Sequence, residues 1–237
     1  RVLDASGMIV APGFIDLHTH YDAQIFWDPY CSMAGWHGVT SLVACNCGFG
    51  FAPMREADRE RAMLSMTRVE SIPLAAMRAG LPWSWESFPE MLAAIGALPK
   101  AVNFGALLPL CPLLTYVLGP ERAKAGVLPT DREHAELRRL VREAMHAGAS
   151  GWSAQRMEEG SGADQQKDFD GSPMVSDVMH KETCIELAQE IGTFSRGFIQ
   201  LTPACKGGGT TAFCEDVAKA AMRPVLFNAV IAFQHYP

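Results

Sequence analysis

The chain has 237 residues, of which 49% are hydrophobic and 19% charged, and its formal net charge is −6. This composition is typical of a globular protein with a buried core, and it excludes disordered and collagen-like classes. The acidic balance argues against a general nucleic-acid or membrane-surface binder. We therefore expect a small-molecule substrate and neither nucleic acid nor a membrane as partner, and the oligomeric state stays open.

The two ends of the chain and its cysteines bear on its origin. It starts at Arg1 rather than at methionine and stops at Pro237 after an apolar run, so we interpret it as a piece of a longer reading frame. Any targeting signal would then precede Arg1. The seven cysteines are an odd number scattered among apolar residues, which favours a reducing cytoplasm over a disulfide framework.

Short apolar runs alternate with helical patterns along the chain. The predicted strands are 8–17, 39–45, 101–108, 150–154, 198–201 and 225–231. Ser87 to Glu90 and Thr130 to Glu133 each fit a capping box at a helix start, and the second helix should end at Gly148. Further helices are predicted around 181–191 and 212–222. This alternation indicates an α/β fold with a parallel sheet covered by helices.

About six strands are visible, whereas a parallel β/α barrel needs eight. No long linker divides them, so one α/β domain is the economical description. We expect the missing strands beyond Pro237. The polar stretch 157–172 is predicted to be a long surface loop bordering an active site.

The first predicted strand runs directly into His18 and His20. Side chains at positions i and i+2 of a strand point the same way, so both imidazoles should share one face at the carboxyl end of that strand. Parallel barrels carry their catalytic groups at this end, and two imidazoles there could hold one divalent metal. The alternative is a polar pair that only forms hydrogen bonds.

Residues 11–22, APGFIDLHTHYD, resemble the first-strand signature of the amidohydrolase superfamily. Residues 36–53, WHGVTSLVACNCGFGFAP, resemble the second-strand region of the N-acyl-D-amino-acid deacylases, also called D-aminoacylases. In that family the cysteine of the Asn-Cys-Gly step is a metal ligand, so the resemblance implies this role for Cys47. Two alternatives stay open: Cys47 is a small buried apolar residue, or Cys45, two positions earlier, is the ligand.

The resemblance implies a TIM-like β/α barrel of the metal-dependent hydrolase type. Residues 8–237 would form this barrel without its last strands, and residues 1–7 would end a small N-terminal β domain. Thr202 and Asn228 stand where family members with two metals have histidines. We therefore expect one zinc ion as cofactor rather than two.

The activity implied is metal-dependent hydrolysis of a linear amide, converting an N-acyl-D-amino acid to a D-amino acid and a carboxylate. The family's catalytic general base would lie beyond Pro237. One alternative is a hydrolase of cyclic amides or other C–N bonds, like the hydantoinases and dihydropyrimidinases. Another is a non-catalytic fragment of such an enzyme, in which case this chain alone would be inactive.

Three further residues are candidates near the substrate. Ser153, late on a strand, is predicted to face substrate, and Arg156 to pair with a substrate carboxylate unless it forms a loop salt bridge. Asp22 could hold an imidazole of the histidine pair, or be a solvated loop carboxylate. The other histidines are expected in structural or surface positions: His37, His134, His146 and His180.

Overall fold

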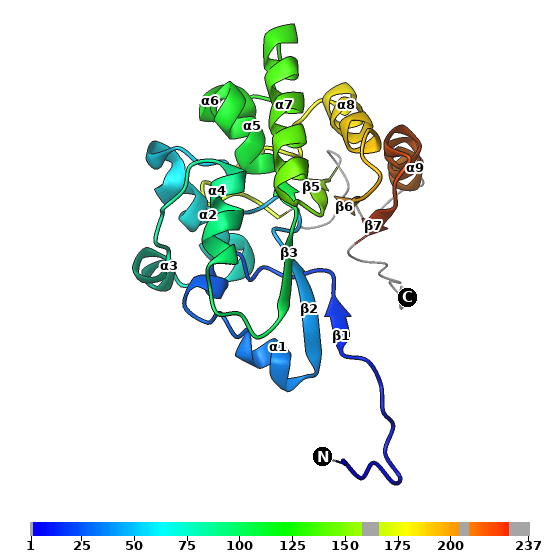
Figure 1. Cartoon of the computed structure of the whole chain (residues 1–237). Helices are drawn as coiled ribbons and strands as arrows, with labels where there is room; N and C mark the ends of the chain where they lie inside the picture. The colour runs from blue at the N-terminus through cyan, green and yellow to red at the C-terminus, as the bar shows by residue number, and fades with distance from the viewer. Residues whose placement is uncertain (1, 158–165, 204–208, 228–237) are drawn as a thin grey trace, which may run out of the picture.

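The computed structural model describes residues 2–157, 166–203 and 209–227, along which helices and strands alternate (Figure 1). The strands are β1 Phe14–Asp16, β2 Val39–Ala44, β3 Asn103–Ala106, β4 Leu108–Pro109, β5 Gly151–Arg156, β6 Phe198–Pro203 and β7 Val225–Phe227. The α-helices are α1 Ser32–Trp36, α2 Arg59–Glu70, α3 Leu74–Gly80, α4 Phe88–Gly96, α5 Leu110–Leu118, α6 Pro120–Lys124, α7 Asp131–Ala147, α8 Lys181–Gly192 and α9 Gly209–Ala221. Short 3-10 turns cover Gln24–Phe26 and Glu56–Asp58.

The strands form two parallel sheets in chain order, β1-β2-β3 and β4-β5-β6-β7. Only Leu107 separates β3 from β4, and its N–H donates to the carbonyl of Ala44 at 3.1 Å. One predicted strand, 101–108, therefore passes from the first sheet to the second. The predicted parallel α/β fold is confirmed, and every described strand directs its carboxyl end the same way along its sheet.

The first predicted strand was too long. Regular pairing covers only Phe14–Asp16, while Met8, Ile9 and Val10 are 72%, 95% and 83% exposed. No described strand lies beside residues 8–13 to accept their backbone hydrogen bonds, and the N-terminal segment extends away from the body (Figure 1). The division at residue 7 stays a prediction, and residues 228–231 lie outside the described residues.

The two capping boxes are confirmed. Ser87 and Thr130 accept hydrogen bonds from the backbone N–H groups of Glu90 and Glu133, and both glutamates bond back to the cap residue. Helix α7 ends as predicted at Gly148, whose φ of 116° lies in the left-handed region that favours glycine.

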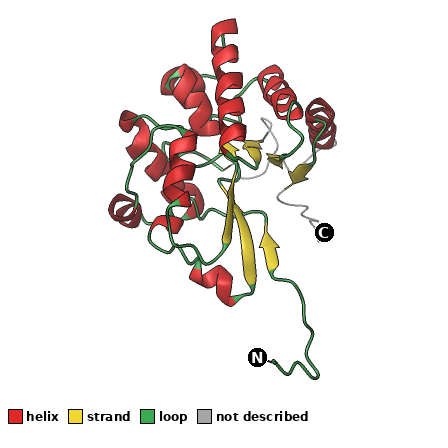
Figure 2. Ribbon diagram, in the orientation of Figure 1, coloured by secondary structure: helices red, strands yellow, loops and turns green. Residues whose placement is uncertain are grey.

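Helices cover the second sheet. Helix α7 contacts α5 and α8, and α8 contacts α9, so these helices lie side by side along the sheet (Figure 2). Trp152 of β5 is fully buried beneath them, and its indole N–H donates to the carbonyl of Leu187 at 3.0 Å. None of the helices in the described part of the chain is both long and apolar enough to cross a membrane.

Candidate metal centre

The loop after β1 carries the two histidines of the motif. Thr19 stands between them, and its N–H and hydroxyl both donate to the carbonyl of Val43, at 3.1 and 2.8 Å. Thr19 therefore continues the pairing of β1 with β2 beyond Asp16. His18 and His20 flank it on the opposite side, with ring centroids 5.5 Å apart.

The loop after β2 brings a cysteine to this pair. The Cys47 sulfur lies 3.3 Å from Nε2 of His18, and one ligand atom from each of His18, His20 and Cys47 lies within 4.8 Å of the others. Within the described residues, these three form the one such group of His, Cys, Asp or Glu side chains. Cys45 is buried outside it, so the structure brings Cys47 to the histidines.

The backbone explains why the two cysteines differ. Strand β2 ends at Ala44, and Cys45 and Cys47 both have left-handed φ angles, 63° and 57°. The alternation rule that places positions i and i+2 on one face therefore does not apply to them. Asn46 fixes the turn, because its side-chain amide donates to the carbonyls of Thr19 at 3.2 Å and Val43 at 2.9 Å.

Ser153 supports the same loop. It is fully buried on β5, where its hydroxyl accepts from the N–H of Gly48 at 2.9 Å and donates to the carbonyl of Cys45 at 2.5 Å. Both hydrogen bonds go to backbone, so in this structure the hydroxyl holds the Cys47 loop. Ser153 is the third of the six residues of β5, not late on the strand as predicted, and its contact with substrate stays a prediction.

Arg156 also turns toward protein groups. Its guanidinium donates to the carbonyls of Asp177 at 3.2 Å and Met179 at 2.5 Å, and lies 5.3 Å from the ring centroid of Phe213. This arrangement holds the segment before α8 against α9. A pairing of Arg156 with substrate would have to compete with these backbone contacts, so it is not part of the centre described here.

Two carboxylates lie beside the group. Asp22 is fully buried and accepts from the N–H of Cys45 at 3.2 Å, and burial raises its pKa to about 7. It is therefore not a solvated carboxylate. Nor does it hold an imidazole, because its Oδ2 atom has no hydrogen-bond partner among the described residues and its Oδ1 atom accepts from Cys45.

Glu70 is a neighbour that sequence reasoning missed. It ends α2, and its carboxylate lies 3.4 Å from Nε2 of His20. Burial, followed by repulsion from Asp22, raises the pKa of Glu70 to about 7. No local signal marks this residue, because its approach to His20 depends on how α2 packs against the sheet.

The electrostatics of the group suit a metal. Burial, with repulsion from His18, lowers the pKa of His20 to about 4, and burial also lowers the pKa of His18. Both imidazoles are then neutral near pH 7, which is the form that binds metal. Burial raises the pKa of the Cys47 thiol to about 12, and a divalent cation would reverse this by stabilising the thiolate.

The donor set fits zinc. Ligand atoms of a tetrahedral zinc site lie roughly 3.3–3.6 Å apart, given zinc–nitrogen and zinc–sulfur bonds of about 2.0–2.3 Å. The ligand atoms of this group lie within 4.8 Å of one another, so only small side-chain shifts would bring them to the distances of a zinc site. Two imidazoles and one thiolate would leave the fourth position open, as in catalytic zinc sites.

The remaining histidines lie elsewhere, as expected. His37 is exposed at the end of α1, and His134 contacts Glu186 at 2.6 Å. His146 and His180 are exposed and contact the backbone carbonyls of Arg142 and Gly126. None of the four belongs to the three-residue group found in the described part of the chain.

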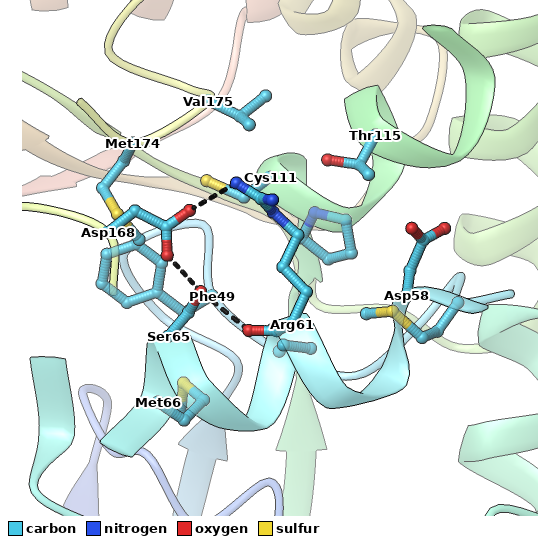
Figure 3. A pocket seen from close by; sticks show the side chains of 14 residues that line it. Phe49, Asp58, Arg61, Ser65, Met66, Cys111, Thr115, Asp168, Met174 and Val175 are labelled. Carbon is cyan, nitrogen blue, oxygen red and sulfur yellow. Dashed lines mark hydrogen bonds and ion pairs between the residues drawn. The ribbon is translucent and has the colours of Figure 1, made fainter. Parts of the chain in front are cut away.

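A pocket lies one side chain, that of Phe49, away from the group, and Figure 3 shows its lining. Its apolar lining comes from Phe49, Met54, Ala62, Met66, Pro112, Met174 and Val175. Two features connect it to the centre. The Phe49 ring lies 6.2 Å from the His20 ring, and Met66 precedes Glu70 by one turn of α2, about 6 Å along the helix.

A charged cluster closes one side of this pocket (Figure 3). Asp168 is only 4% exposed and contacts Nζ of Lys124 at 2.5 Å and Nη2 of Arg61 at 3.4 Å. It also accepts a hydrogen bond from Ser65, and Arg61 reaches Asp170 at 3.1 Å. Two cations balance two carboxylates here, so the cluster ties the 166–175 segment to α2 and α6 without leaving a net charge.

Comparisons with known proteins show the family of the chain. Residues 1–184 match the model of the amidohydrolase family. The chain belongs to this family. It is 41% identical over 158 residues to an uncharacterized protein of Mycobacterium tuberculosis, a match covering 65% of this chain and 25% of that protein. It is 35% identical over 151 residues to a D-aminoacylase of Alcaligenes xylosoxydans xylosoxydans, covering 64% of this chain and 28% of the relative.

The fold has a solved counterpart. The N-acyl-D-glutamate deacylase from Bordetella bronchiseptica, in complex with zinc and a phosphonate inhibitor, superposes with a TM-score of 0.66 at 23% identity. The match covers 94% of this chain and 41% of that enzyme. The resemblance to the D-aminoacylases is thus confirmed, and the chain corresponds to less than half the length of the proteins compared here.

Proposed function

We propose that His18, His20 and Cys47 hold one zinc ion at the carboxyl ends of β1 and β2. The observation that carries this proposal is the approach of these three side chains to within 4.8 Å, with Cys47 buried and both histidines half-buried. The partnerless Nδ1 atoms and the neutral imidazoles support it. Glu70 lies beside His20 and would restrain the orientation of that ring.

The activity we propose is hydrolysis of the amide bond of an N-acyl-D-amino acid. When bound, zinc would supply Lewis-acid chemistry, lowering the pKa of a coordinated water toward about 7 and polarising the scissile carbonyl. The buried walls around His20 and Phe49 would limit bulk water at the reacting bond. The carboxylate that moves the proton would lie in the part of the enzyme beyond Pro237.

The apolar pocket is proposed to receive the apolar part of this substrate. Its methionine-rich lining adapts to chains of different shape, and Phe49 separates it from His20 by one side chain. A substrate whose carbonyl lies at the metal could therefore extend an acyl chain or an amino-acid side chain into the pocket.

The proposal also includes three expectations about the whole enzyme: its fold, its partners and its location. The two parallel sheets would be part of a closed β/α barrel in the whole enzyme, with residues 1–7 ending a small β domain. Small molecules would be its partners. A cytoplasmic location is supported by the cysteines, because none of the six in the described residues forms a disulfide.

The test combines metal content with activity. Elemental analysis of the purified protein should find about one zinc per chain, and the His18→Ala/His20→Ala double variant should lose it. N-acetyl-D-amino acids, their L-enantiomers and hydantoins would be assayed in parallel on a form extended beyond Pro237.

The outcomes separate the alternatives. Hydrolysis confined to the D-substrates supports the deacylase, and hydrolysis of hydantoins would favour the cyclic-amide hydrolase. Full activity in a chelated, zinc-free protein would overturn the metal centre. A folded protein that binds zinc but hydrolyses none of these substrates would favour the non-catalytic fragment.

A further inference from the structure

Strand β6 reaches the Cys47 loop with two polar side chains. Gln200 and Thr202 lie two positions apart, on the same face of the strand, and are 0% and 7% exposed. The Gln200 carbonyl oxygen Oε1 accepts a hydrogen bond from the N–H of Cys47 at 2.6 Å. The Thr202 hydroxyl lies 3.2 Å from the Cys47 sulfur. One strand thus contacts both the backbone and the side chain of this cysteine.

The hydrogen-bond directions follow from the donors available. Because Oε1 of Gln200 accepts from Cys47, its Nε2 faces Thr202 and donates to Oγ1 at 3.1 Å. The single proton of the Thr202 hydroxyl then points to the sulfur. The Gln200–Thr202 pair therefore presents a donor, not an acceptor, to Cys47.

We propose that Thr202, oriented by Gln200, is a positioning residue that donates its hydroxyl proton to the Cys47 thiolate and holds that sulfur toward His18. This inference rests on the proposed metal centre and adds to it a role for β6. The strand would act through hydrogen bonds to a ligand, at a position where two-metal relatives were expected to have a histidine.

The backbone gives a reason why such a pair is needed. Cys47 has a φ of 57°, a conformation that residues with a side chain adopt only when their surroundings hold them. The Gln200 contact holds the peptide, and the Thr202 contact selects the direction of the sulfur. Hydrogen bonds from such outer partners commonly change metal affinity by about 10–100-fold.

The experiment uses Co²⁺ as a spectroscopic replacement for zinc. Thr202→Val keeps the shape of the side chain and removes its donor, whereas Thr202→Ser keeps the donor. Thr183→Val is the matched control, because Thr183 is also buried but its hydroxyl has no hydrogen-bond partner within the described residues. Each protein is titrated with Co²⁺, and the thiolate-to-cobalt charge-transfer band is recorded with the affinity.

We expect Thr202→Val to bind Co²⁺ about 10-fold more weakly and to move the charge-transfer band to longer wavelength, because the thiolate loses a stabilising donor. Thr202→Ser should restore both values toward wild type, and Thr183→Val should change neither. If Thr202 had a purely structural role, Thr202→Val could lower the Co²⁺ affinity. It would not shift the charge-transfer band, and Thr202→Ser would have no shift to reverse.

Two results would overturn the inference, and they are distinguishable. If the wild-type protein binds Co²⁺ and Thr202→Val shows the same affinity and band, the hydrogen bond has no role at the metal. If the wild type shows no thiolate-to-cobalt band at all, the proposed centre itself fails. Thermal unfolding of each metal-free variant checks the fold, and Thr202→Ala replaces Thr202→Val if valine does not fit.

Discussion

The Cys47 sulfur lies 3.3 Å from Nε2 of His18, although 29 positions separate the two residues in the chain. The contact joins the loop after β1 to the loop after β2. Parallel pairing of these strands makes it possible, because both loops then leave the same end of the sheet.

The first prediction separates the two neighbouring cysteines. Cys47→Ala should lower the affinity for zinc by more than about 10-fold, because it removes a proposed ligand. Cys45→Ala should leave the zinc content near one per chain, because Cys45 is buried outside the three-residue group. Elemental analysis after dialysis against a weak chelator measures both. If only the Cys45 variant lost zinc, Cys45 and not Cys47 would be the ligand.

The second prediction concerns the serine beneath the loop. Ser153→Ala leaves the N–H of Gly48 and the carbonyl of Cys45 without their buried partner, which should cost about 1–3 kcal/mol of unfolding free energy. Zinc affinity should fall with it, since the same loop carries Cys47.

Denaturant unfolding and zinc titration measure these two effects. Ser176→Ala serves as the control, because Ser176 is also fully buried but contacts the thiol of Cys111. It should leave the zinc affinity unchanged. An unchanged stability in Ser153→Ala would show that these two hydrogen bonds do not hold the loop.

The third prediction concerns the apolar pocket. Ala62→Leu should fill part of its volume and exclude about two methylene groups of a long substrate, worth about 0.8 kcal/mol each. The ratio kcat/KM for an N-octanoyl-D-amino acid should then fall roughly 10-fold. The value for the N-acetyl compound should change less than about twofold.

Two comparisons make this prediction specific. Ala93→Leu, the same change at an exposed position of α4 outside the pocket lining, should affect neither substrate. A series of N-acetyl-D-amino acids with side chains of different length tells whether the pocket takes the acyl chain or the amino-acid side chain. Equal losses for short and long substrates of both kinds would remove the pocket from substrate binding.

The fourth prediction is a pH dependence away from the centre. Hydrogen bonds from Arg122 and from the Thr130 backbone lower the pKa of Glu133 to about 2. A group whose pKa is lower in the folded state contributes stability above its unfolded pKa of about 4.3 and loses it as the pH falls toward the folded value. Glu133→Gln should therefore destabilise the protein by about 1 kcal/mol at pH 7.

The difference between wild type and Glu133→Gln should shrink between pH 5 and pH 2, as followed by denaturant unfolding at each pH. Glu143→Gln is the control on the same helix, where the exposed pair with Arg139 should contribute little. A constant difference across this pH range would show that the charge of Glu133 does not stabilise α7.

Local sequence patterns predicted those features that depend on residues close together in the chain. Apolar runs predicted the strands. The capping boxes predicted the starts of α4 and α7, and Gly148 predicted the end of α7, because caps act within one helical turn. The His-x-His spacing predicted two imidazoles on one face. Only the segment 8–13 failed among the described strands, since an apolar run needs a neighbouring strand to pair with.

The construction of the centre depends on packing between distant segments. From the sequence, Cys45 and Cys47 were expected on the same face of an extended strand, so either could be the ligand. Their left-handed backbone conformation ends that strand geometry. The two hydrogen bonds of Ser153 to the Cys47 loop were not predicted. Glu70 and Gln200 reach the centre from α2 and β6, which lie far from the histidine pair in the sequence. Such contacts depend on how helices and strands pack against one another, and no spacing within one segment records that packing.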